Sequence, residues 1–306
     1  MKKGFALSLP VVCLLIGQAL SAQDTTARAL QGIGQVARGA VLTKISSQFT
    51  FTEGPAVNKK GDIYFTDQPN DKIWKYDAKG RLSVFMDKTG RSNGLYFDRQ
   101  GNLIACADLK GELWSISPSG EKTVLLDNYE GKQLNGPNDL WIDAKGGIYF
   151  TDPYYQRNYW ERKQPAMDGM KVYYLPKGAK QARIVEDQLV RPNGIVGTPD
   201  GKTLYVADIQ ANKTYKYTIG EDGSLGAKEL FVPQGSDGIT LDHKGNVYLS
   251  GNGVTIYNSA GTKIGQIPVP SRWVGNLCFG GKKKNILFIT ASESVYTLKM
   301  SVKGVE

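Results

Sequence analysis

The sequence has very few of the side chains that most hydrolases use for nucleophilic or transition-metal chemistry. Its 306 residues include only one histidine and three cysteines. His243 lies in the turn Asp242-His243-Lys244-Gly245, where we predict a surface residue. A Ser-His-Asp or Cys-His mechanism needs a histidine beside its nucleophile. Zinc and copper prefer histidine or cysteine ligands, and no Cys-x-x-Cys or Cys/His spacing occurs. We therefore expect neither a histidine-dependent nucleophile nor a zinc or copper centre.

Cysteine is too sparse for a disulfide framework. Cys13 lies in an apolar run near the N-terminus, without the small-residue context of a lipid-modified cysteine. Cys106 and Cys278 each lie in an apolar stretch with β character. Export from the cytoplasm would permit a disulfide between them. We nevertheless predict two buried free thiols, because they fall in separate repeats of the chain.

Only one long hydrophobic run occurs, from Phe5 to Leu20. It follows Met1-Lys2-Lys3-Gly4 and precedes Ser21-Ala22-Gln23, a pattern typical of a secretory signal peptide. The run is short and contains a proline, which does not favour a membrane span. We predict a signal peptide at 1–22 and an exported protein, periplasmic or secreted, with no membrane attachment after cleavage. An uncleaved N-terminal anchor is the alternative.

Acidic residues are outnumbered, 29 against 38 basic ones, for a formal net charge of +9. The basic residues are dispersed, and Lys282-Lys283-Lys284 is the one short run. We interpret that run as a solvated hairpin tip. No nucleic-acid motif is present, so we expect no nucleic-acid partner. The excess of positive charge is compatible with a mild preference for anionic ligands.

Glycine, in contrast, is abundant, with 36 residues, and it marks a repeat. Six times, a carboxylate or amide residue stands at a turn. In the first five turns a glycine follows eight residues later, whereas the sixth has Lys284 in that place. The turns are Glu53-Gly54, Asn93-Gly94, Asn138-Asp139, Asn193-Gly194, Asp237-Gly238 and Asn276-Leu277.

Each turn is followed by a run of β-branched and aromatic residues that predicts a strand. The runs begin at Ile63, Leu103, Ile148, Leu204, Val247 and Ile286. No helical apolar period is sustained after the N-terminal run. The turns recur at about 40 to 55 residues, which is typical of propeller blades. We therefore predict an all-β fold, a six-bladed β-propeller with four-stranded antiparallel blades, over residues 23–306 as one domain. Residues 41–45 are expected to supply a strand that closes the ring against the last blade.

The six equivalent polar residues would meet at the axis of such a ring. Glu53 and Asp237 offer carboxylates, and Asn93, Asn138, Asn193 and Asn276 offer amides. Carboxylate and amide oxygens suit Ca²⁺. The alternative is that these are ordinary turn residues, because Asn and Asp favour turns. Glu53 speaks against that alternative, since Glu has little turn preference.

The motifs resemble the SMP-30/gluconolactonase family from Phe51 to Leu298. They are Phe51-Thr52-Glu53-Gly54-Pro55, Leu134-Asn135-Gly136-Pro137-Asn138-Asp139, Tyr149-Phe150-Thr151-Asp152-Pro153, Arg191-Pro192-Asn193-Gly194, Leu204-Tyr205-Val206-Ala207-Asp208 and Ser236-Asp237-Gly238. The resemblance implies a six-bladed propeller with one divalent cation, often Ca²⁺, at its axis. It implies that Glu53, Asn193 and Asp237 bind the metal, and that Asn138 binds it or contacts the substrate.

The same resemblance implies hydrolysis of a small-molecule lactone, with Asp237 as base or nucleophile. Metal binding would weaken Asp237 as a base, so a positioning role for it stays open. Asn93, Asn138 and Asn276 are expected to orient the hydroxyl groups of a sugar lactone. A phosphotriesterase or aryl-esterase on the same metal is one alternative. A non-catalytic propeller that binds sugars or proteins is another.

Three features are individual to this chain. Asp108 stands where some members carry histidine, and Tyr154 replaces the second proline of the usual Pro-Pro-Tyr. An insertion at 153–170 begins with Pro153-Tyr154-Tyr155-Gln156-Arg157-Asn158-Tyr159-Trp160. Its aromatic residues either cover the mouth of the channel as a lid or pack on their own blade.

Overall fold

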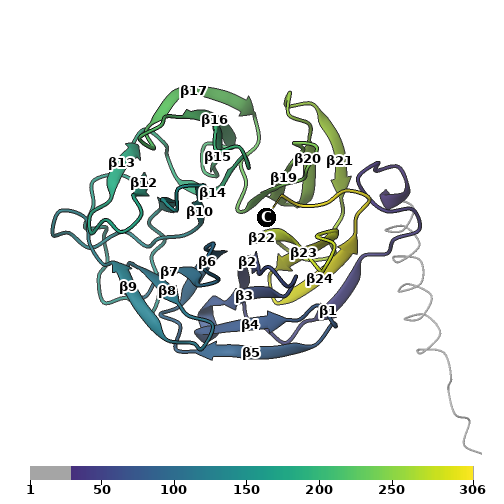
Figure 1. Cartoon of the computed structure of the whole chain (residues 1–306), viewed down its shortest axis with the longest axis horizontal. Coiled ribbons are helices and arrows are strands. Elements are labelled where there is room, and N and C mark those ends of the chain that lie inside the picture. Colours follow the sequence, from purple (N-terminus) through teal and green to yellow (C-terminus); the bar gives the residue numbers. More distant parts are fainter. Residues whose placement is uncertain (1–28, 306) are drawn as a thin grey trace, which may run out of the picture.

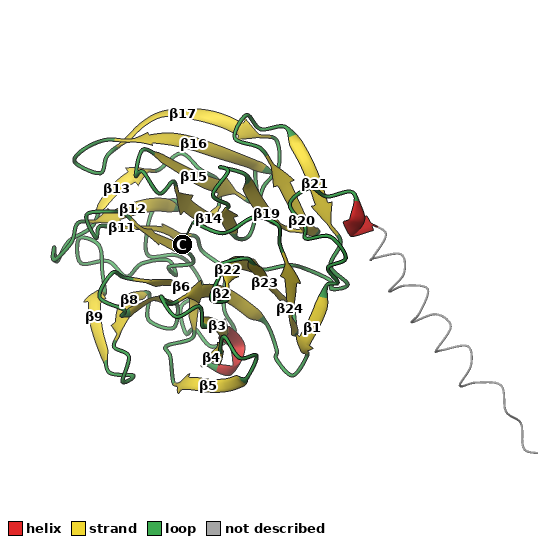
Figure 2. Ribbon diagram, turned by 45° about the vertical axis from the view of Figure 1, so that its right-hand side comes forward, coloured by secondary structure: helices red, strands yellow, loops and turns green. Residues whose placement is uncertain are grey.

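Six antiparallel sheets of four strands each surround a central axis in the computed structural model, which describes residues 29–305 (Figure 1). The predicted six-bladed propeller is therefore confirmed. The predicted signal peptide at 1–22 lies outside the described residues. Helical structure within them is limited to a short turn at their beginning and to the 3₁₀ turn Gln68–Asn70 (Figure 2). No helix in this part of the chain is long and apolar enough to cross a bilayer.

The blades follow one another in chain order. Each begins with its innermost strand and ends at the rim. The first three comprise β2 (Thr52–Val57), β3 (Ile63–Asp67), β4 (Lys72–Tyr76) and β5 (Leu82–Asp87); β6 (Ser92–Phe97), β7 (Leu103–Ala107), β8 (Glu112–Ile116) and β9 (Lys122–Leu126); and β10 (Leu140–Ile142), β11 (Ile148–Asp152), β12 (Lys171–Leu175) and β13 (Arg183–Glu186).

The next two blades repeat this order, and the last one takes its rim strand from the start of the domain. They comprise β14 (Pro192–Gly197), β15 (Thr203–Asp208), β16 (Lys213–Ile219) and β17 (Leu225–Val232); β18 (Ile239–Leu241), β19 (Val247–Gly251), β20 (Gly253–Tyr257) and β21 (Lys263–Ile267); and β22 (Asn276–Gly280), β23 (Ile286–Ala291), β24 (Ser294–Lys299) and β1 (Thr43–Ser46).

Closure of the ring by the N-terminal segment is confirmed. β1 pairs antiparallel with β24, with Thr43 opposite Thr297. This contact joins two parts of the chain that are about 250 residues apart. It also removes an unpaired strand edge, which would otherwise invite association with other chains.

The core lies between the blades. All five residues of β3 and all five of β11 are buried, because both faces of a second strand are covered by neighbouring sheets. The rim strand β5 is half-exposed along its length. Their composition follows this difference: β3 and β11 share the sequence Ile-Tyr-Phe-Thr-Asp, and such near-continuous apolar runs are typical of strands that are covered on both faces.

The repeated glycines perform two different structural tasks. The later glycine of each repeat makes the hairpin between the first two strands, with φ from +69° to +90° at 61, 101, 146, 201 and 245. Lys284 takes φ +54° at the sixth hairpin. All six hairpins therefore have a residue with a left-handed backbone at this position, and in the sixth blade that residue is a lysine instead of a glycine.

The earlier glycine lets neighbouring inner strands touch. A Cβ on Gly54 would lie 2.1 Å from the carbonyl oxygen of Asn93, and one on Gly94 would lie 2.5 Å from that of Asn138. The backbone N–H of Gly94 donates to the same Asn138 carbonyl over 2.7 Å. In the four repeats that have this glycine, at 54, 94, 194 and 238, the polar residue is thereby held next to the following blade.

The predictions for cysteine and histidine are also confirmed. Cys106 on β7 and Cys278 on β22 are buried and free. His243 is exposed in the hairpin between β18 and β19.

Candidate functional site

A cavity of about 320 Å³ lies at the end of the channel where the inner strands begin. Five of the six equivalent polar residues of the repeat reach it. Its lining consists of Phe51, Glu53, Gln68, Asn93, Asn138, Tyr155, Arg157, Asn193, Ile209, Asp237 and Trp273. The convergence that the repeat predicts is thus found for Glu53, Asn93, Asn138, Asn193 and Asp237, while their chemical roles stay predictions.

Asn276 is the exception, since it does not line this cavity. Its side-chain nitrogen donates to Asp139 over 3.2 Å, and its side-chain oxygen accepts the N–H of Leu277. Pairing with β23 runs without interruption from Asn276 onward. The β2–β3 ladder instead breaks directly after Glu53, and Asn193 lies within the break of the β14–β15 ladder. The regular ladder leaves the Asn276 amide beside Asp139, which is poorly placed for the predicted contact with substrate hydroxyls.

The two carboxyl groups of the site, Glu53 and Asp237, both have raised pKa values. Burial raises the pKa of Glu53 well above its ordinary value, and the neighbouring charge of Asp237 raises it further. Burial likewise raises the pKa of Asp237 to about 6, although hydrogen bonds from Trp273 and Asn193 oppose that shift. The indole N–H of Trp273 donates to Asp237 over 2.6 Å. Two buried carboxylates this close are stabilised when a cation lies between them.

Asn193 supplies an oxygen without a partner. Its side-chain nitrogen donates to the hydroxyl group of Tyr155 over 3.0 Å. Its side-chain oxygen is buried and accepts no hydrogen bond. A buried unpaired amide oxygen is costly, and a metal ion would satisfy it. Asn93 and Asn138 also line the cavity wall.

These donors fit a hard divalent cation. Glu53 and Asp237 provide anionic oxygen, and Asn193 and Asn138 provide neutral amide oxygen, which is a combination typical of Ca²⁺. The described residues contain no group of three or more His, Cys, Asp or Glu side chains suited to a metal.

The sequence analysis did not predict four of the polar or aromatic residues that line the cavity, which are Gln68, Tyr155, Arg157 and Trp273. Tyr155 and Arg157 belong to the 153–170 insertion, so its aromatic composition was the available signal. Both line the cavity, whereas Trp160 of the same insertion is buried in a different contact. The insertion therefore reaches over the channel and also packs on the protein. Gln68 and Trp273 carry no repeat signal, because loop paths bring them to the axis.

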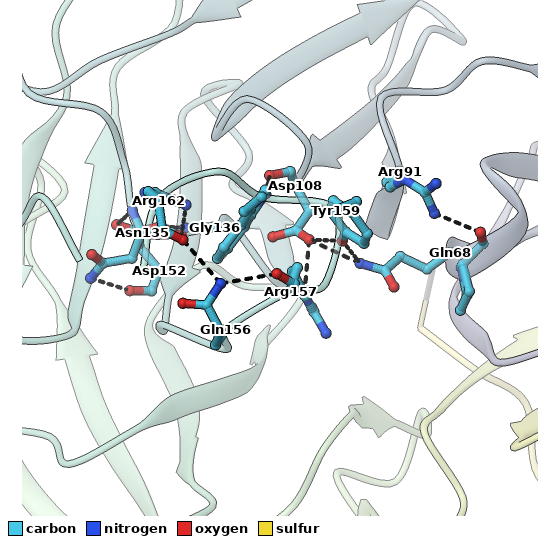
Figure 3. A network of polar contacts seen from close by, with 12 residues as sticks. Gln68, Arg91, Asp108, Asn135, Gly136, Asp152, Gln156, Arg157, Tyr159 and Arg162 are labelled. Carbon is cyan, nitrogen blue, oxygen red and sulfur yellow. Dashed lines mark hydrogen bonds and ion pairs between the residues drawn. The ribbon is translucent and has the colours of Figure 1, made fainter. Parts of the chain in front are cut away.

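Asp108 anchors the insertion (Figure 3). This carboxylate is only 1% exposed and accepts from Gln68 over 2.9 Å, from the Nε of Arg157 over 3.0 Å, and from the hydroxyl group of Tyr159. The indole of Trp160 donates to the Asp108 backbone carbonyl over 3.2 Å. Asp108 is thus the buried acceptor that orients the first half of the loop.

A second buried carboxylate holds the turn below the loop. Asp152, at the end of β11, accepts the backbone N–H groups of Asn135 and Gly136 over 2.9 and 2.7 Å. Arg162 donates to the backbone carbonyl of Leu134 over 2.8 Å and to that of Asn135. These contacts connect the insertion to the turn that precedes Asn138, so the loop and the cavity wall support one another (Figure 3).

Comparison with known proteins places these features in a family. Residues 51–293 match the family described as SMP-30/gluconolactonase/LRE-like region. The gluconolactonase of Zymomonas mobilis is 29% identical over 292 residues, covering 85% of this chain and 81% of that protein. The lactonase drp35 of Staphylococcus epidermidis is 27% identical over 253 residues, covering 76% of this chain and 74% of that protein.

A solved structure agrees over the same region. The gluconolactonase of Xanthomonas campestris superposes with a TM-score of 0.81 at 27% sequence identity. The match covers 87% of this chain and 91% of that one. The propeller fold is therefore shared over most of the length of both chains.

Proposed function

Because the chain belongs to the SMP-30/gluconolactonase/LRE-like family, we propose that it hydrolyses a sugar lactone to the open hydroxy acid. The reaction adds water to the lactone carbonyl carbon and breaks the bond between that carbon and the ring oxygen. The names of the relatives, two of them gluconolactonases and one a lactonase, support this class of substrate. The observation that carries the proposal is the meeting of Glu53, Asn193 and Asp237 in one cavity.

We propose that Glu53, Asn138, Asn193 and Asp237 hold one divalent cation, with Ca²⁺ as the proposed ion. The unpaired oxygen of Asn193 and the two stressed carboxylates support this set. When bound, such an ion polarises the lactone carbonyl and offsets negative charge on its oxygen.

The chain's own residues would bind and orient the reactants. Asp237 accepts the proton of the attacking water, and the hydrogen bond from Trp273 keeps its carboxylate in one orientation. Asn93, Asn138 and Gln68 face the cavity with amide groups that suit the hydroxyl groups of a sugar. Tyr155 covers the cavity and limits access of bulk water.

A pH-stat assay tests the proposal. A panel of sugar lactones is added to purified protein in the presence of Ca²⁺, and base uptake is compared with that of buffer alone. Turnover that disappears with a chelator and returns with Ca²⁺ is expected. Turnover that survives complete chelation would remove the cation from the proposal, while leaving the lactonase activity in place.

The same preparation separates the alternatives. Faster hydrolysis of a phosphotriester or an aryl ester than of any lactone would favour the esterase reading. Calorimetry that shows cation binding, together with no hydrolysis of any substrate, would favour a non-catalytic propeller that binds sugars or proteins.

We also propose that the protein is exported and that 1–22 is removed. The composition of those residues supports this. N-terminal sequencing of the protein from the periplasm or the medium of expressing cells is the test, and a mature N-terminus at Gln23 is the expected result. An intact Met1 on membrane-bound protein would support the anchor reading instead.

A further inference from the structure

A second hollow of about 570 Å³ adjoins the central cavity. It shares Gln68 and Arg157 with the cavity, so these two side chains lie between the two spaces. It is polar and contains two arginines and no acidic residue. Its lining consists of Gln68, Pro69, Arg91, Gln156, Arg157, Asn158 and Tyr159.

Arg157 presents a free binding face at this junction. Its Nε donates to Asp108, and its side chain is 24% exposed. Its two terminal nitrogens have no partner among residues 29–305. Figure 3 shows that end of the guanidinium pointing away from Asp108. The contact that holds the loop to Asp108 uses only the Nε of Arg157, so its two terminal nitrogens are available to a ligand.

Arg91 stands on the other side of Tyr159. Its guanidinium carbon lies 4.2 Å from the centre of the Tyr159 ring, and one terminal nitrogen donates to the carbonyl of Pro69 over 2.6 Å. Its backbone is left-handed, with φ +50°, which costs about 1 kcal/mol for a residue other than glycine. Asp71 holds that conformation by accepting the Arg91 N–H over 2.6 Å.

The positive charge of the hollow exceeds what the protein neutralises. Asp108 forms an ion pair with Arg157, whereas no acidic side chain within the described residues forms one with Arg91. A divalent cation on Glu53 and Asp237 would leave the central cavity without net negative charge. Arg91 then has no carboxylate partner within residues 29–305, and Arg157 has only Asp108, so an additional anion in the hollow would be attracted to both guanidinium groups.

We propose that the substrate is an anionic sugar lactone. The lactone ring occupies the central cavity, and a carboxylate or phosphate at the far end of the sugar binds to Arg157 and Arg91 in the outer hollow. Guanidinium groups suit both anions, because parallel N–H donors match two oxygens of either group. This inference rests on the proposed lactonase function and narrows its substrate class.

Three matched lactones provide the test. They are gluconolactone, which is neutral, and its analogues with a carboxylate or a phosphate at carbon 6. We expect kcat/KM to be at least tenfold higher for one or both anionic lactones, mainly through a lower KM. One charge-assisted hydrogen bond contributes about 1.5 to 3 kcal/mol, which corresponds to about 10- to 150-fold. The two anionic arms show whether the natural group is a carboxylate or a phosphate.

Substitutions then identify the recognition residues. Arg157→Gln and Arg91→Gln are each expected to reduce the anionic-to-neutral ratio of kcat/KM about tenfold. Arg157→Lys should retain part of the ratio, because it keeps the charge. Arg99→Gln is the matched control, since Arg99 is exposed in the β6–β7 hairpin at the opposite end of the strand. Thermal unfolding confirms that each variant is folded.

The possible failures are distinguishable. Equal or better turnover of the neutral lactone, with a ratio unchanged in Arg157→Gln, would overturn this inference and leave the lactonase proposal intact. If no lactone is hydrolysed, the lactonase proposal fails, and calorimetric titration with the same three lactones decides anion recognition. Tighter binding of an anionic lactone that is lost in Arg157→Gln would still support it, and equal binding would end it.

Discussion

The hydroxyl group of Tyr155 accepts a hydrogen bond from the side-chain nitrogen of Asn193 over 3.0 Å. Tyr155 belongs to the inserted loop, and Asn193 belongs to the inner strand β14. The bond orients the amide so that its oxygen, buried and unpaired, is available to a cation. Loop position and cation affinity are therefore expected to be coupled.

Tyr155→Phe tests this coupling. The substitution removes one acceptor from Asn193 and leaves the aromatic ring in place. A typical hydrogen bond contributes about 1 kcal/mol, so Ca²⁺ affinity should fall about fivefold in calorimetric titration. Tyr154→Phe is the control, because the hydroxyl group of Tyr154 donates to Gln156 on the exposed side of the loop. Equal affinity in both variants would separate the loop from the cation site.

Glu53→Gln tests the ligand role of the more stressed carboxylate. The amide keeps the shape but loses the charge, so Ca²⁺ affinity should fall by about 100-fold or more, or about 3 kcal/mol. In the presence of chelator the same variant should unfold at a higher temperature than the wild type, because a buried negative charge beside Asp237 is removed. Wild-type affinity in the calorimeter would contradict the assignment.

The stability of chelated protein should fall as the pH rises from 4 to 7. The pKa of Asp237 is raised to about 6 by burial, against about 3.9 in an unfolded chain. The folded state therefore binds more protons in this window, and its advantage is lost as the pH passes the folded pKa. The loss of stability is therefore expected to be steepest as the pH passes about 6.

Thermal unfolding at both ends of that pH range checks this prediction. Addition of Ca²⁺ should raise the melting temperature more at pH 8 than at pH 5, because the ion binds the deprotonated pair. The extra effect should be smaller in Asp237→Asn. A Ca²⁺ effect that grows toward low pH would contradict the predicted sign.

Asp237→Asn should abolish lactone turnover, with a loss of at least about 10³-fold, since a general base alone contributes about 10² to 10⁴. The indole of Trp273 could still donate to the remaining oxygen of Asn, so the fold should persist in circular dichroism. Asp200→Asn, in the exposed β14–β15 hairpin, is the control. Retained turnover in Asp237→Asn would remove this residue from the mechanism.

Thiol counting tests both the cysteine assignment and the proposed cleavage. Cys106 and Cys278 are buried in different blades, so neither should react with a thiol reagent in the native protein. Burial also raises the pKa of the Cys106 thiol, which suppresses the reactive thiolate further. Denatured mature protein should release two thiol equivalents without reductant. Three equivalents would show that Cys13 and the segment around it remain.

From the sequence, only the site residues that belong to the repeat could be predicted. Glu53, Asn93 and Asn193 follow from it because each repeat places its polar residue at the same register of an inner strand. Asn276 has the same register, but Leu277 replaces the glycine after it, and the strand pairs without a break. The sequence shows the substitution but not its consequence, because the direction of an amide depends on Asp139 of a distant blade.

Local pattern thus determined the architecture. Alternating apolar residues and hairpin turns recur with one period, and blades that cannot bury both faces alone must stack into a ring. The same periodicity placed a carboxylate or amide at each inner turn. Only the tertiary structure decided which of these side chains share a cavity, and that Tyr155, Arg157 and Trp273 join them. Those contacts link segments separated by tens of residues along irregular loops, and no local preference encodes where such a loop ends in space.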